Sequence, residues 1–182
     1  KIKQALEYIK EEDPVTTQDT LNMCQIPAPS YKEEKKAEYI RDRFREIGLR
    51  DVRIDAVGNV LGIWPGTGEG PNVMLAAHTD TVFPEGTDLS IRKEGNRYYC
   101  PGINDDTHAV AEMIAVAKAM IHADLHTKGD LIFCANVCEE GLGDLRGVKY
   151  LFGYDNKASE ECPEVDAFVS IDNQYTGVVI YT

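Results

Sequence analysis

The chain has 182 residues, enough for one domain with a hydrophobic core, and its 43% apolar residues exclude a disordered protein. Its 31 acidic residues outnumber its 19 basic residues, which gives a formal net charge of -12. This balance argues against nucleic acid or an anionic membrane surface as a partner, because no basic excess is present to neutralise phosphates.

The cysteines do not indicate a disulfide framework. Their number is odd, five, and no two of them have the Cys-x-x-Cys spacing. Buried free thiols are the simplest interpretation, and they favour a reducing, cytoplasmic compartment. No apolar run is long enough for a signal peptide or a membrane span.

Three helices are predicted in the first part of the chain. Apolar residues at helical spacing predict the first over residues 2–12, ended by Pro14, and a short second helix over residues 17–24. Ser30 and Glu33 have the S-x-x-E spacing of a capping box, which predicts the start of the third. The lysines and glutamates of that third helix are expected on a solvated face.

Strands and helices then alternate. Two hairpins are predicted, one around Gly58-Asn59 and one around Gly95-Asn96. Strand-like runs lie at residues 51–56, 59–64, 73–77, 131–137, 165–171 and 178–182, and helical patterns at 107–121 and 144–152. This alternation predicts an α/β domain with a mixed sheet flanked by helices on both faces.

Polar groups that can bind a metal follow several of these elements. His78 and Asp80 come directly after the apolar run 73–77, at a strand end where open α/β sheets build their sites. Further acidic groups stand at other element boundaries: Asp105-Asp106, Glu139-Glu140 and Asp172. Imidazole suits zinc and similar cations, and carboxylates can bridge two of them. We therefore expect these groups to converge on one metal site.

Each of these signals also has an ordinary explanation. A histidine after a strand is more often a satisfied polar residue than a ligand. The pair Asp105-Asp106 before a helix would usually cap it, and Glu139-Glu140 would usually be a solvated loop. Their joint occurrence at element ends is what indicates a metal site.

On these residues the chain resembles the M20 metallopeptidases, which include peptidase T, carboxypeptidase G, succinyl-diaminopimelate desuccinylase and aminoacylase-type deacylases. The resemblance covers nearly the whole chain and is greatest to the peptidase T-like branch. The matching stretches are QIPAPSYKEEKKAEYIRDRFREIGL, AAHTDTVFP, PGINDDTHAVAEMIAVAKAM, CANVCEEGLGDLRGVKYL and FVSIDN. It implies a zinc-exopeptidase-like fold and a site with two divalent ions, zinc in the first place and cobalt or manganese as alternatives.

The resemblance also implies a ligand set. His78 and Asp172 would bind the first ion, Asp105 would bridge the two ions, and Glu140 would bind the second. A departure lies just after the paired aspartates, where family members often have Lys and Gly and this chain has Thr107-His108. His108 is therefore given no role in the site.

Two catalytic roles follow from the same resemblance. Asp80 would orient the imidazole of His78. Glu139 would be the general base that takes a proton from the attacking water and returns it to the leaving amine. The peptide bond between Asp105 and Asp106 is expected to be cis.

The implied activity is metal-dependent hydrolysis of a peptide bond in small peptides by an exopeptidase, with aminopeptidase action of the tripeptidase type. Two alternatives remain, an N-acyl-amino-acid deacylase of the same family and a non-catalytic fragment that binds a metal or a partner. Family members run to roughly twice this length, a two-domain size. The resemblance therefore implies that residues 1–182 are the N-terminal part of a catalytic domain. A lid domain, through which a homodimer could form, and a C-terminal half with a final histidine ligand would be absent.

Overall fold

A five-stranded mixed sheet forms the centre of the structure, a computed structural model that describes residues 1–153 and 158–172. The strands lie in the order β1-β2-β6-β3-β7. Their bounds are Arg50–Ile54 for β1, Val60–Trp64 for β2, Leu131–Asn136 for β6, Val73–His78 for β3 and Ala167–Ser170 for β7. The predicted α/β class with a mixed sheet is therefore confirmed.

The parallel part of the sheet decides where functional groups can gather. β3 runs parallel to both of its neighbours, β6 and β7, whereas β1, β2 and β6 pair antiparallel. His78 at the end of β3 pairs with Asn136 at the end of β6. The carboxyl ends of three neighbouring strands thus meet at one edge, which is where open α/β sheets place their sites.

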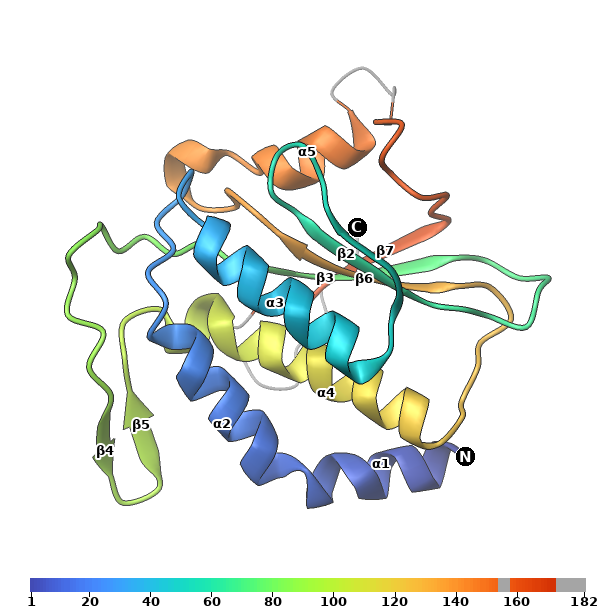
Figure 1. Ribbon diagram of the computed structural model, residues 1–182, viewed down its shortest axis with the longest axis horizontal. Coiled ribbons are helices and arrows are strands. Elements are labelled where there is room, and N and C mark those ends of the chain that lie inside the picture. The colour runs from blue at the N-terminus through green and yellow to red at the C-terminus, as the bar shows by residue number, and fades with distance from the viewer. Residues whose placement is uncertain (154–157, 173–182) are drawn as a thin grey trace.

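Helices cover both faces of this sheet (Figure 1). One face carries α3 (Glu34–Ile47) and α4 (His108–His122), with α1 (Ile2–Glu11) and α2 (Asp13–Cys24) packed against α4. The other face carries α5 (Arg146–Phe152).

Each face has its own apolar core. Phe44 of α3, Ile114 of α4 and Phe133 of β6 belong to the larger core and are fully buried. Leu151 of α5 packs with Met74 in the smaller core on the opposite face. Burial of each such side chain contributes about 1.5–3 kcal/mol, so the two cores fix β3 from both sides.

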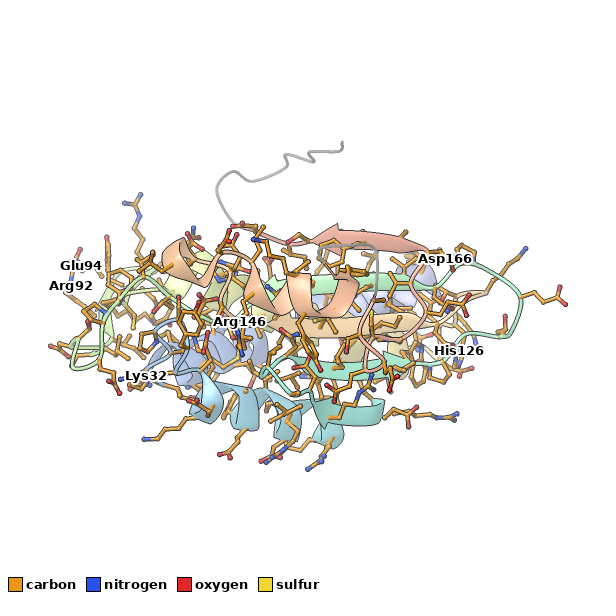
Figure 2. The ribbon with its side chains drawn as sticks, turned by 90° about the horizontal axis from the view of Figure 1, so that it is seen from above. Lys32, Arg92, Glu94, His126, Arg146 and Asp166 are labelled. Carbon is orange, nitrogen blue, oxygen red and sulfur yellow. The ribbon has the colours of Figure 1, made fainter. Side chains whose placement is uncertain are left out.

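A two-stranded hairpin stands apart from the main sheet. Its strands are β4 (Arg92–Glu94) and β5 (Arg97–Tyr99), as the Gly95-Asn96 turn predicts. Figure 2 shows Arg92 and Glu94 at one end of the molecule and His126 and Asp166 at the opposite end. Two short helical turns, Ile103–Thr107 and Gly141–Gly143, precede α4 and α5.

The helix prediction needs two corrections. The second helix starts at Asp13 rather than at residue 17, and Pro14 lies in its first turn, where the missing N–H of proline is not needed. The capping box is also wrong, because α3 begins without any side-chain cap hydrogen bond. The strand expected at residues 178–182 lies outside the described residues. None of the helices in residues 1–153 and 158–172 is long and apolar enough to cross a membrane.

The turn between β1 and β2 is tied to the loop before α5 by one side chain. Asn59 is fully buried, and its amide donates to Asp55 at 2.7 Å and to the backbone oxygen of Gly147 at 3.0 Å. Its oxygen accepts from the backbone N–H of Val137 at 3.0 Å. These bonds hold both ends of the segment that carries Glu139 and Glu140.

We expect Asn59→Ala to lower the free energy of unfolding by about 2–4 kcal/mol, because buried backbone groups of Val137 and Gly147 lose their partner. Urea denaturation followed by circular dichroism measures the change. Asn22→Ala, at an exposed position of α2, is the matched control and should stay within about 0.5 kcal/mol of the starting protein. Equal stability of the two variants would contradict the role assigned to Asn59.

Candidate metal centre

His78 is the last residue of β3, and its imidazole lies at the middle of the candidate site. The side chain is almost completely buried. Nδ1 lies 3.0 Å from the backbone oxygen of Asp80, and Nε2 lies 2.9 Å from Oδ1 of Asp105. Because a backbone oxygen can only accept, Nδ1 carries a proton. Nε2 is therefore the nitrogen that faces the acidic groups and can bind a cation after losing its own proton.

Asp80 connects the end of β3 to the loop that carries Glu139 and Glu140. Its fully buried carboxylate accepts the amide protons of Glu139 at 2.9 Å and Glu140 at 3.1 Å, and the hydroxyl proton of Ser30 at 2.6 Å. The expected contact with the imidazole of His78 is longer, 3.5 Å from Nδ1 to Oδ1. The loop contacts are the shorter ones, so Asp80 positions the glutamates as well as the histidine.

Glu33 also supports this loop, through Cys138. Its buried carboxylate accepts the backbone N–H of Cys138 at 3.0 Å and lies 3.2 Å from that residue's thiol. Cys138 has a φ of 52°, a left-handed conformation that is uncommon for a residue with a side chain. Ser30 and Glu33, which the sequence pattern assigned to a helix cap, are thus used to hold the residues around Glu139 and Glu140.

The paired aspartates lie in the turn before α4, and their peptide bond is cis, as expected. Asp106 is fully buried, and its Oδ2 accepts the backbone N–H of His78 at 3.0 Å. Its Oδ1 is also buried and has no hydrogen-bond partner among the described residues. A buried carboxylate oxygen without a partner is costly, and a cation is the group that would satisfy it.

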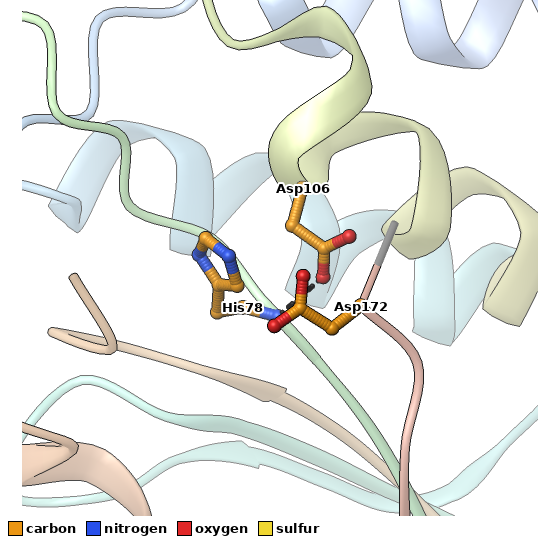
Figure 3. Close-up of side chains that lie close together, drawn as sticks. All are labelled: His78, Asp106 and Asp172. Carbon is orange, nitrogen blue, oxygen red and sulfur yellow. Dashed lines mark hydrogen bonds between the residues drawn. The ribbon is translucent and has the colours of Figure 1, made fainter. Parts of the chain in front are cut away.

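The acidic groups form two sets around the shared histidine. Ligand atoms of His78, Asp106 and Asp172 lie within 4.8 Å of one another, as do those of His78, Glu139 and Glu140. Figure 3 shows the first set, with Asp106 and Asp172 on one side of the histidine. Every residue assigned to the site from the sequence thus lies near His78. Asp105 belongs to neither set, but its carboxylate contacts Nε2 of His78.

Asp106 was expected near the site as part of the acidic pair, but sequence analysis assigned it no role as a ligand. The structure groups it with His78 and Asp172, whereas Asp105 meets Nε2 of His78 and is about half exposed. The signal for Asp106 was its position beside Asp105. Neighbouring aspartates are too common for that adjacency alone to mark both as ligands.

Charges in the site shift the pKa of His78 and Asp80 in opposite directions. Burial disfavours the imidazolium, but the hydrogen bond to Asp80 and the charges of Asp106 and Glu139 outweigh it and raise the pKa of His78 to about 9. Burial would likewise raise the pKa of Asp80. Its hydrogen bonds from His78, Ser30 and the loop amides prevail, and its pKa lies below the usual range.

The remaining carboxylates crowd one another. Burial, followed by the charges of its acidic neighbours, raises the pKa of Glu139, and the same causes raise that of Glu140. Burial raises the pKa of Asp106 to about 8. Carboxylates that repel each other around one imidazole fit divalent cations, because a cation replaces the repulsion with attraction. This donor set suits zinc, cobalt or manganese.

A family model for "Peptidase family M20/M25/M40" matches residues 74–179, more than half of the chain. The chain belongs to the M20 peptidase family. Among curated relatives, it is 34% identical over 120 residues to a putative [LysW]-lysine/[LysW]-ornithine hydrolase of Pyrococcus abyssi, covering 66% of this chain and 32% of the relative. It is 30% identical over 139 residues to the succinyl-diaminopimelate desuccinylase of Corynebacterium glutamicum, covering 76% and 37%.

Solved structures of this M20 fold are similar over nearly the whole chain. The dipeptidase Dug1p of Saccharomyces cerevisiae gives a TM-score of 0.72 at 20% identity, covering 95% of this chain and 41% of that one. A Bacillus subtilis protein described as a dinuclear metal-binding peptidase of the M20 family gives 0.62 at 15% identity, covering 91% and 44%. The M20 chain described here thus spans about a third of the length of the two curated relatives.

Proposed function

We propose that this M20 chain binds two divalent cations and takes part in hydrolysis of a peptide bond in small peptides, as an exopeptidase of the tripeptidase type. The observation that carries the proposal is the convergence of five carboxylates on one imidazole at the carboxyl end of β3. The five are Asp105, Asp106, Asp172, Glu139 and Glu140. The acidic side chains of the site suit a bound cation. A bound cation could in turn attract the carbonyl or carboxylate oxygen of a substrate.

The two sets of ligands around His78 suggest how the cations would be divided. Nε2 of His78 with Asp172 and the paired aspartates would hold one ion, and Asp105 would extend to the second. Glu140 would hold the second ion on the glutamate side of the histidine. Zinc is our first candidate, since an imidazole with carboxylates suits it, and cobalt and manganese accept similar donors.

The catalytic base we propose is Glu139. When bound, the cations would polarise the scissile carbonyl and lower the pKa of the attacking water. Glu139 would take the proton from that water and return it to the leaving amine, a task that suits a carboxylate whose pKa lies above its usual value. Its backbone N–H is held by Asp80, so the loop keeps the carboxylate beside the metal ligands.

A deacylase is the second candidate, and the identity to a desuccinylase over 76% of this chain favours it. Such an enzyme would use the same metal ligands and the same base on the amide of an N-acyl amino acid. The two reactions differ in the acyl group on the carbonyl side of the amide, an amino acid for the peptidase and another acid for the deacylase. The residues around His78 do not select between these groups.

Metal content and product release test the proposal together. We expect the purified chain, loaded with zinc, cobalt or manganese and dialysed, to retain about two ions per chain by elemental mass spectrometry. One ion would favour a site with a single complete ligand set. Folded protein that retains none would overturn the proposal.

Substrate profiling with the loaded protein then separates the candidates. Release of free amino acids from tripeptides and dipeptides supports the peptidase, and release of an acid from N-acyl amino acids supports the deacylase. Metal retention with no turnover of either panel would support the non-catalytic alternative and contradict the proposed activity.

A further inference from the structure

Lys36 of α3 is buried beneath the candidate metal site, although sequence analysis placed the lysines of this helix on a solvated face. Its side chain is only 2% exposed, whereas the adjacent Lys35 is exposed. Lysine is almost never fully buried without groups that compensate its charge. The surroundings of Lys36 must therefore supply such compensation.

The ammonium group joins the two segments that carry the candidate ligands. Nζ donates to the backbone oxygen of Thr79 at 3.2 Å and to the hydroxyl of Thr107 at 3.0 Å. Thr79 lies between His78 and Asp80, and Thr107 directly follows the paired aspartates. The ammonium group of Lys36 thus contacts both ligand-bearing segments from the side of α3.

No carboxylate among the described residues forms an ion pair with Lys36 within 4.0 Å, so its charge is not committed to one partner. The charges of Asp80 and Asp106 both act on it, and the thiols of Cys24 and Cys100 are near. Burial is the larger effect and lowers the pKa of Lys36 to about 8, which still leaves it protonated at neutral pH.

We propose that Lys36 is the fixed counter-charge of this site, holding its two ligand segments together and offsetting the repulsion among their carboxylates while no metal is bound. The inference rests on the proposed metal binding and adds a positioning residue from an element that contributes none of the proposed ligands. Removing the charge of Lys36 leaves the imidazolium of His78 to offset several carboxylates in the metal-free site, whereas bound divalent cations supply positive charge themselves. The metal-free form should therefore depend on Lys36 far more than the metal-loaded form.

The test compares melting temperatures with and without manganese or zinc at pH 7 for the starting chain, Lys36→Met and the control Lys35→Met. Methionine keeps the length and apolar stem of the side chain and removes its charge. We expect Lys36→Met to melt well below the starting chain without metal. The rise on adding metal should exceed that of the starting chain by at least about 2 °C. The dissociation constant from calorimetry should also be lower, because a positive charge that repels the cations is gone.

A purely structural role would lower the melting temperature equally with and without metal, so an unchanged metal-induced rise would overturn the inference. If Lys36→Met folds only when metal is present, its metal-induced rise cannot be measured, and Lys36→Gln takes its place in the same comparison. If it does not fold at all, the same comparison is made with Lys36→Gln, which keeps a donor, and failure of that variant to fold under either condition also overturns it. Failure of the starting chain and Lys35→Met to bind metal would instead refute the proposed function.

Discussion

Replacing Glu139 with glutamine should lower amide hydrolysis about 10²–10⁴-fold and leave metal binding nearly unchanged, because the amide cannot take a proton from water. Glutamine preserves the size of the side chain, and the backbone N–H of residue 139 would still be held by Asp80. The measurements are the turnover rate on the best peptide or N-acyl substrate and the metal content of the same sample.

Glu69→Gln is the control for this experiment, since Glu69 is an exposed glutamate in the loop before β3, at the opposite end of the strand from His78. It should match the starting chain in both measurements. A Glu139→Gln variant that keeps its turnover within about tenfold would assign the base to another group. Loss of metal together with activity would make Glu139 a ligand instead.

His78→Ala should weaken zinc or manganese binding by more than about 100-fold, the upper range for losing a residue that merely supports a ligand. The reason is that both sets of candidate ligands share this imidazole. The alanine variant also removes the positive group that the neighbouring carboxylates surround. Isothermal titration calorimetry with the metal alone measures the loss.

His122→Ala is the matched control, because His122 lies at the far end of α4 and stacks on Tyr8 rather than facing the acidic groups. Its metal affinity should equal that of the starting chain. Should His78→Ala bind metal as tightly as His122→Ala, the metal centre would not be where we propose it.

The strands and the main polar positions could be predicted because they depend on neighbours in the sequence. The Gly58-Asn59 turn and the apolar run ending at His78 are local patterns, and both appear where expected. The placement of His78 at the carboxyl end of a parallel strand follows from the alternation of strands and helices. It needs no knowledge of the individual side-chain contacts.

The supporting residues could not be predicted, because their partners are distant in the sequence. Ser30 and Glu33 match a helix cap locally, but their hydrogen bonds go to Asp80 and Cys138, 50 and 105 residues away. Lys36 lies at helical spacing from Ile40 and Phe44, on the buried face of α3, but its partners Thr79 and Thr107 are 43 and 71 residues away. Tertiary contacts of this kind override local pattern.

The two sides of the site are carried by strands of unequal burial, β3 and β7. His78 ends β3, which lies between two parallel strands and under two apolar cores, so its amides should be among the last to exchange with deuterium. Asp172 follows β7, whose four residues are all exposed and which pairs with β3 at the rim of the described sheet. Local opening of β7 would separate Asp172 from His78 while leaving the pairing of β1, β2, β6 and β3 intact. Cation exchange at this centre would thus begin on the aspartate side, at the free-energy cost of opening one short strand rather than of unfolding the domain.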